Sequence, residues 1–152
     1  MKTEVTWGDC NIATGQPRSL PETVQVEIEI ARGGLLKWGS DGRVDFVSPV
    51  PCPFNYGAVR AITGGDGAPL DAVVMGSTLP RGRIGVWPVQ GVVHFEDAGC
   101  VDDKLVCAAR PLGPRERLGL LLFFHVYGAC KTALNRLRGL RGATGVRGYQ
   151  WR

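Results

Sequence analysis

The sequence lacks a long apolar segment, a signal peptide, and the cysteine patterns of disulfide-rich or zinc-binding proteins. Its longest apolar run, Leu118 to Tyr127, is about half a membrane span and contains His125. The N-terminal residues MKTEVTWGDC have no apolar signal-peptide core. The five cysteines are odd in number and form no CxxC pair, so they indicate neither a disulfide framework nor a zinc ribbon. We therefore expect a cytoplasmic protein with free thiols and no membrane association.

Charged residues are also rather few, at 21% against 44% hydrophobic residues, which excludes wholesale disorder. A chain of 152 residues can bury roughly two thirds of its unfolded surface, enough for one domain spanning residues 1–152. The net charge of +4 favours anionic partners. The stretch after residue 130 is basic and free of acids. Because few aromatic residues interleave with its basic ones, we expect a solvated tail and not a nucleic-acid site.

The 22 glycines and 10 prolines are spread along the chain, which is typical of short strands joined by tight turns. Apolar residues alternate from Val24 to Ile30 and predict a half-buried strand. Pro114 can open a helix that runs to about Leu137. Residues 1–22 are expected to be an irregular arm and residues 139–152 a loosely held basic tail. Further strands are predicted at 43–47, 70–75, 84–95 and 104–109. The pattern predicts an α+β, mainly β fold: a small closed or partly closed barrel with a helix packed outside.

The acidic residues carry the functional signal. Asp66 and Asp71 share a spacing with Asp97 and Asp102, and each pair spans a glycine-containing turn beside a predicted strand. Carboxylates that converge repel one another unless a cation lies between them. Hard oxygen donors suit Mg²⁺, which commonly binds a few carboxylates together with substrate phosphate. The alternative is that these aspartates are ordinary exposed turn residues.

Several segments, read together, resemble the soluble family I inorganic pyrophosphatases. They are Val26-Glu27-Ile28-Glu29-Ile30, Pro53-Phe54-Asn55-Tyr56-Gly57, Asp66-Gly67-Ala68-Pro69-Leu70-Asp71, Glu96-Asp97-Ala98-Gly99, Asp102-Asp103-Lys104-Leu105-Val106 and Phe123-Phe124-His125-Val126-Tyr127. Their order and spacing match over roughly two thirds of the chain. The resemblance implies a five-stranded OB-like β-barrel with a flanking C-terminal helix. It also implies Mg²⁺-dependent phosphoanhydride hydrolysis, with Mn²⁺ as a substitute, by a homo-oligomer that in bacterial members of this length is commonly a hexamer.

The resemblance also assigns roles to individual residues. Asp66, Asp71 and Asp102 match ligands of two activating metals, and Asp97 matches a ligand of the metals that arrive with substrate. Glu29 lies where the family has a site glutamate, and we include it in the metal group. The catalytic groups that would bind and stabilise the phosphates are Lys37, Tyr56, Lys104 and Tyr127.

The chain departs from the family pattern at five positions. Ala68 stands where the family has the aspartate that helps to deprotonate the attacking water. The others are Gly39 for a glutamate, Phe46 for an arginine, Cys52 for a tyrosine and Gly128 for a lysine.

These losses remove cations from the leaving-phosphate side, so we expect pyrophosphate to bind poorly. We expect Gly39, Phe46, Cys52 and Gly128 to line one cavity, in which Phe46 and the space at Gly128 would receive an organic leaving group. The sequence thus favours a phosphohydrolase acting on an organic phosphate or diphosphate. An ordinary or slow inorganic pyrophosphatase is the alternative, and a non-catalytic protein that binds a phosphate-containing small molecule is a further one. Cys52 is expected to be a packing thiol and His125 a core histidine.

Overall fold

The structure, a computed structural model, describes residues 5–6, 19–38, 41–48 and 50–152. It confirms a mainly β fold with one helix, α1, over Pro114–Leu137. The strands of the first half are β1 (Val5–Thr6), β2 (Thr23–Ile30), β3 (Leu36–Trp38), β4 (Val44–Val47) and β5 (Asn55–Thr63). Those of the second half are β6 (Pro69–Val74), β7 (Ile84–Asp97), β8 (Cys100–Val101), β9 (Lys104–Cys107) and β10 (Gly145–Trp151).

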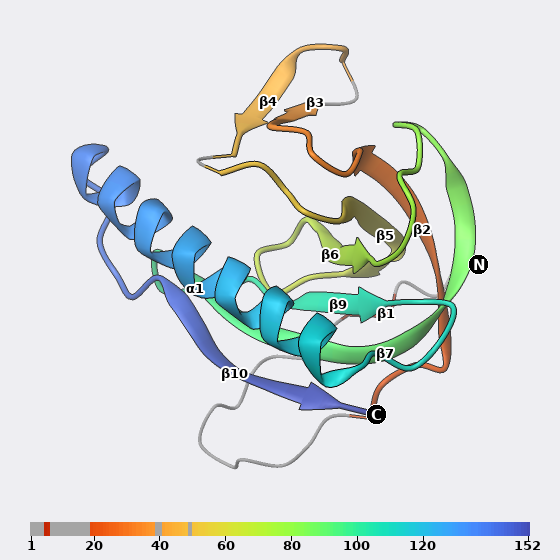
Figure 1. Cartoon of the computed structure of the whole chain (residues 1–152). Coiled ribbons are helices and arrows are strands. Elements are labelled where there is room, and N and C mark those ends of the chain that lie inside the picture. The colour runs from red at the N-terminus through yellow and green to blue at the C-terminus, as the bar shows by residue number, and fades with distance from the viewer. Residues whose placement is uncertain (1–4, 7–18, 39–40, 49) are drawn as a thin grey trace.

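Five of these strands close into an OB-like barrel. Their order is β5-β2-β7-β9-β6, and β6 pairs again with β5 to complete the circle. The β6–β9 pair is parallel, whereas the other four barrel pairings are antiparallel. Figure 1 shows α1 lying across one side of this barrel, with the β3–β4 hairpin projecting at the end remote from β10. The predicted barrel and flanking helix are therefore confirmed.

Alternation along the strands divides the core into two layers. In β2 the side chains of Val24, Val26 and Ile28 are buried, as the alternating pattern predicts, and they fill the barrel interior together with Leu105 of β9. The intervening positions of β9 face outward, where Val106 packs under the helix. A second cluster therefore forms between the outer barrel wall and α1.

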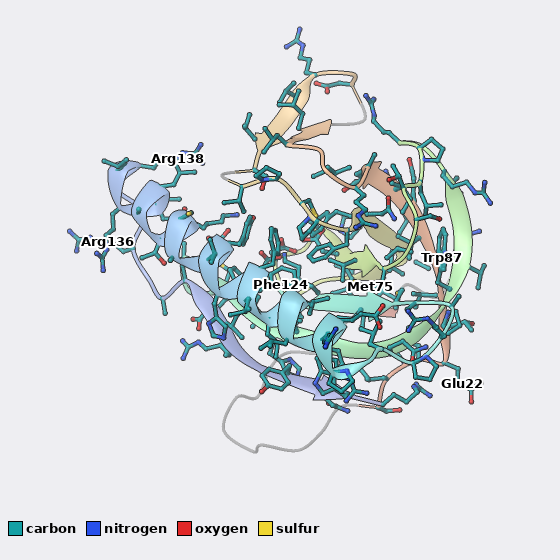
Figure 2. All side chains as sticks on the ribbon, viewed as in Figure 1. Glu22, Met75, Trp87, Phe124, Arg136 and Arg138 are labelled. Atoms are coloured by element: carbon teal, nitrogen blue, oxygen red, sulfur yellow. The ribbon has the colours of Figure 1, made fainter. Side chains whose placement is uncertain are left out.

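This second cluster is largely aromatic. Phe124 of α1 packs with Phe95 of β7, their ring centroids 6.2 Å apart, and with Phe54 at 5.8 Å. Figure 2 shows Phe124 on the side of α1 that faces the barrel. Tyr127, three residues on and thus on the same helical face, lies 5.7 Å from Phe95 between ring centroids. The helix is thereby fixed against β7.

The ends of α1 follow from local chemistry. The Gly113 N–H donates to Oε2 of Glu116 at 2.8 Å, which satisfies a backbone group at the helix start, and Arg110 pairs with the same carboxylate. Beyond the last turn Gly139 has φ +71°, a conformation that glycine adopts without strain. Among the described residues, no helix has the length and apolar character to cross a membrane.

Two segments correct the sequence prediction. The tail after residue 139 is not loosely held, because β10 pairs with β7 from Gly145 to Trp151. The glycines and arginines of this segment show no strand pattern, and β10 is stabilised by its pairing with β7. β5 was also missed, because the prolines that precede it indicate irregular structure. Within β5, Gly57 lies so close to the Glu27 carbonyl group that a Cβ atom would not fit. In the predicted N-terminal arm, β1 pairs with β5, and residues 7–18 lie outside the described part.

Candidate active site

A pocket of about 440 Å³ opens beside α1, on the outer face of the barrel. It brings together most of the residues that the sequence singled out, from β5, β6, β7, β9, α1 and the connecting turns. Those in its wall are Tyr56, Asp66, Asp71, Asp97, Asp102, Lys104 and Tyr127. Ile30, Cys52, Phe123 and Phe124 supply its apolar lining. Both aspartate pairs thus border the same pocket.

The centre of the site is a buried ammonium group between two carboxylates. Asp71 of β6 stands directly beside Lys104 of β9 in the parallel register, and both face outward. Lys104 Nζ lies 2.8 Å from Asp71 Oδ2 and 2.7 Å from Asp102 Oδ1, with the lysine side chain only 2% exposed. Burial alone would lower the pKa of Lys104, but the two carboxylates hold it above its usual value. Lys104 is therefore a permanent cation at this point.

The two tyrosines contribute neutral hydroxyl groups. Burial raises the pKa of Tyr56 well above its ordinary value, and the nearby Asp71 and Asp102 raise it further. Burial likewise raises the pKa of Tyr127. The Tyr56 ring centroid lies 5.8 Å from Lys104 Nζ, so its hydroxyl group belongs to the same cluster. Both phenols stay protonated at neutral pH and act as O–H donors toward an anion.

Asp97 is bound to partners on α1. Its Oδ1 accepts a hydrogen bond from Asn135 Nδ2 at 2.7 Å, and its Oδ2 lies 2.8 Å from Lys131 Nζ. Burial would raise the pKa of Asp97, but the hydrogen bonds from Lys131 and Asn135 leave it below its usual value. In this structure both oxygens of Asp97 are engaged by α1, so its carboxylate positions Lys131, and the metal-ligand role that the resemblance implies for Asp97 stays a prediction.

Lys131 lines the pocket, although the sequence analysis assigned it to a solvated basic stretch. Its side chain is 13% exposed, and its Nζ lies 5.7 Å from the Tyr127 ring centroid. Burial would lower the pKa of Lys131, but Tyr127 and Asp97 raise it above the ordinary value. The available signal was its position four residues after Tyr127, which places both side chains on one face of the predicted helix.

Other predicted positions lie apart from the pocket wall. Glu29 is on β2 with its carboxylate 3.9 Å from the Arg60 guanidinium, and it is not among the residues that line the pocket. At Gly128 a Cβ would come within 3.2 Å of Gly145 Cα and 3.4 Å of Phe95 Cε2. The space expected there is filled, and the predicted continuous cavity is wrong at Gly128, although Cys52 does line the pocket.

Part of the predicted site lies on the β3–β4 hairpin. The backbones of Lys37 and Phe46 pair with each other across it. The side chains of both residues, and the whole of Gly39, fall outside the described part of the structure.

Two histidines and one cysteine can be compared with the pocket wall. His94 Nδ1 lies 3.1 Å from Asp103 Oδ2, away from the pocket wall. His125 is exposed on α1, so the prediction that it is a core histidine is wrong. Burial raises the pKa of Cys52 to about 11, which keeps it a thiol at neutral pH. Cys52 therefore packs, as predicted, and is not an activated nucleophile.

The donor set suits a hard divalent cation. Asp71 and Asp102 already converge on a positive charge, and burial and repulsion from Asp71 raise the pKa of Asp102 despite Lys104. Asp66 borders the same pocket, although its Oδ1 also accepts a hydrogen bond from its own turn, from Ala68 N at 3.0 Å. Within the described residues, no group of three His, Cys, Asp or Glu side chains lies close enough to hold a metal ion by itself. Mg²⁺ commonly completes its shell with water and phosphate, so Asp66, Asp71 and Asp102 fit that ion.

Comparison with known proteins gives one consistent result. The family model described as inorganic pyrophosphatase matches residues 23–115. An inorganic pyrophosphatase of Saccharolobus solfataricus is 30% identical over 105 residues, which cover 63% of this chain and 60% of that protein. One from Mesorhizobium japonicum is 34% identical over 110 residues, covering 66% and 60%. The chain thus spans about 60% of the length of the curated relatives it matches.

Solved structures agree on the fold. The inorganic pyrophosphatase of Thermus thermophilus superposes with a TM-score of 0.70 at 24% identity, covering 90% of this chain and 86% of that one. That of Neisseria gonorrhoeae gives 0.67 at 24% identity, covering 99% and 89%. At these identities the likeness concerns the fold alone.

Proposed function

The chain belongs to the inorganic pyrophosphatase family, and from that premise we propose that it hydrolyses inorganic pyrophosphate to two phosphate ions with Mg²⁺ as cofactor. Mn²⁺, which accepts the same oxygen donors, would serve as a substitute. The observation that carries the proposal is the single pocket in which carboxylates, ammonium groups and neutral phenols converge. Its volume of about 440 Å³ falls within the range of small-molecule sites.

The residues of the pocket divide into two roles. Asp66, Asp71 and Asp102 would hold Mg²⁺, which when bound supplies Lewis acidity toward water and phosphoryl oxygens. Lys104, Tyr56 and Tyr127 would donate hydrogen bonds to the phosphoryl oxygens and stabilise charge that grows there as the bond breaks. Lys37 is assigned to the same role on the sequence resemblance alone. Glu29 and Gly128 are left out because they lie outside the pocket wall.

The lost aspartate at Ala68 affects the rate in this proposal. Removal of a group that accepts the proton of the attacking water commonly slows a reaction by about 10²–10⁴. The remaining carboxylates of the pocket must take over that proton. We therefore expect turnover below that of family members which keep an aspartate at this position.

The hypothesis of an organic substrate is weakened by the packing around Gly128. It required open space at Gly128, which Phe95 and Gly145 fill. The relatives reported above are all inorganic pyrophosphatases, and none points to an organic leaving group. Of the interpretations that the sequence left open, the inorganic pyrophosphatase is now preferred.

The direct test is phosphate release from pyrophosphate in the presence of Mg²⁺. Asp71→Asn should abolish it, because a cation-binding carboxylate becomes neutral. Glu22→Gln, at an exposed position outside the pocket, is the matched control and should retain activity. A panel of organic mono- and diphosphates runs in parallel. Release from that panel but not from pyrophosphate would restore the organic substrate, and no release from either would favour a non-catalytic phosphate-binding protein.

We further propose that copies of the chain associate, as the resemblance to hexameric members implies. Leu118, Leu122 and Val126 recur every four residues on α1 and are 58%, 56% and 53% exposed, so they form an apolar stripe on one helical face. Sedimentation equilibrium checks this, and a monomer at micromolar concentration would contradict it. A cytoplasmic location remains a prediction that the free cysteines among the described residues support.

A further inference from the structure

We propose that Lys131 is the second phosphate-binding cation of the pocket and replaces the lysine that is missing at Gly128. This inference rests on the proposed function and names a residue that determines how tightly a diphosphate binds. Among the described side chains of the pocket wall, the cations are Lys104 and Lys131. Lys104 lies on the barrel side of the pocket between Asp71 and Asp102, and Lys131 supplies positive charge on the α1 side, beside Asp97.

The helix geometry explains why the lysine lies at 131 and not at 128. Gly128 is buried against β10, where even a Cβ would lie 3.2 Å from Gly145 Cα. A lysine there would crowd Gly145 and the Phe95 ring, so its neighbours would have to shift by a few tenths of an ångström. One turn further along the helix, position 131 shares a face with Tyr127 and reaches the pocket. The helix packing on β10 therefore disfavours a side chain at position 128, whereas position 131 accommodates a lysine that lines the pocket.

Lys131 is held in place by a network that extends to Thr144, just before β10. Its Nζ lies 2.8 Å from Asp97 Oδ2, and the other oxygen of Asp97 accepts from Asn135. Asn135 Nδ2 also donates to Thr144 Oγ1 at 3.0 Å, and that same oxygen accepts from Ala98 N at 2.9 Å. The ammonium group is thus fixed on the pocket wall before substrate arrives. A preorganised cation loses little freedom on binding, which favours affinity.

The competing interpretation is that Lys131 only neutralises Asp97 and would leave when Mg²⁺ binds there. The two interpretations predict opposite effects for Lys131→Met. If Lys131 binds phosphate, the variant loses diphosphate affinity. If Lys131 is only a counter-ion, the variant exposes Asp97, binds Mg²⁺ more tightly and keeps its diphosphate affinity.

Isothermal titration calorimetry with imidodiphosphate, a diphosphate that resists hydrolysis, separates them at fixed Mg²⁺. We expect Lys131→Met to weaken binding by about 10- to 150-fold, the range for one hydrogen bond to a charged group. Lys131→Arg should recover part of this loss. Arg136→Met removes a similar charge from an exposed position of α1, where Figure 2 shows the side chain pointing away from the barrel, and should bind like the parent.

Each outcome decides the matter. Unchanged imidodiphosphate affinity in a folded Lys131→Met protein overturns the inference, whether or not Mg²⁺ affinity rises. If that variant does not fold, Lys131→Gln keeps a hydrogen-bond donor to Asp97 without the charge and gives the same test. If the parent protein binds no imidodiphosphate, the proposed function itself is refuted. If the parent and Lys131→Met bind imidodiphosphate equally tightly, only the role of Lys131 is refuted.

Discussion

Replacing Lys104 by methionine tests the electrostatic centre of the pocket. Methionine is unbranched and flexible like the lysine stem, so the change removes the ammonium group with little change in packing. Asp71 and Asp102 would then face each other without the cation that now lies 2.8 and 2.7 Å from their oxygens. Both aspartate side chains are only 15% exposed, so water cannot fully replace that contact.

The expected loss follows from this burial. Removing one partner of a buried ion pair costs about 3–5 kcal/mol, because the remaining charge stays buried and uncompensated. Since some water reaches both carboxylates, we expect the lower end, about 3 kcal/mol in the free energy of unfolding. For a chain of this length that corresponds to a fall in Tm of about 6–12 °C.

The assay is thermal and urea unfolding in EDTA, repeated in Mg²⁺. Mg²⁺ should stabilise the parent protein, and it should stabilise Lys104→Met more, because the ion restores positive charge between the carboxylates. Adding Asp102→Asn to Lys104→Met should recover much of the loss in EDTA, since the repulsion is then gone. A Lys104→Met protein as stable as the parent in EDTA would refute this account of the site, as would equal stabilisation of both by Mg²⁺.

Three other changes test the packing. Gly128→Lys should lower the free energy of unfolding by about 1–3 kcal/mol by overpacking against Phe95, and should not improve pyrophosphate binding; urea unfolding and calorimetry measure both. In native protein, Cys100 should react with a thiol reagent well before Cys52, whose pKa of about 11 reflects burial, and equal rates by mass spectrometry would contradict this. Deleting residues 145–152 should cost several kcal/mol, since backbone hydrogen bonds contribute about 0.5–1.5 kcal/mol each, and unchanged urea unfolding would show that β10 adds nothing.

The sequence predicted the elements whose pattern is local. β2 alternates strictly, and α1 begins at Pro114 and ends at Leu137 as its residues indicate. β5 and β10 were missed for one shared reason. Each pairs with a neighbouring strand that stabilises it, and its own sequence, with glycine and arginine among its residues, carries little signal of a strand.

The same distinction applies to the candidate site. The spacing of the aspartates predicted a cluster because short turns and neighbouring strands hold them together. The pairing of Asp97 with Asn135 joins residues 38 apart, across the packing of α1 on β7, and no local pattern reports it. The filled space at Gly128 also depends on β10, which the sequence had assigned to a loose tail. The assignment of an open space to Gly128 thus followed from one missed strand, whereas the Asp97–Asn135 contact depends on the packing of α1.

The order of the elements along the chain also limits how the pocket can assemble during synthesis. Every strand of the barrel lies before residue 108, so the barrel and its Lys104 cluster can form while α1 and β10 are still being made. Asn135 and Thr144, which fix the Asp97 side, leave the ribosome later. A chain that folds its barrel first therefore holds only part of the pocket wall, which Tyr127 and Lys131 complete when α1 packs on the barrel.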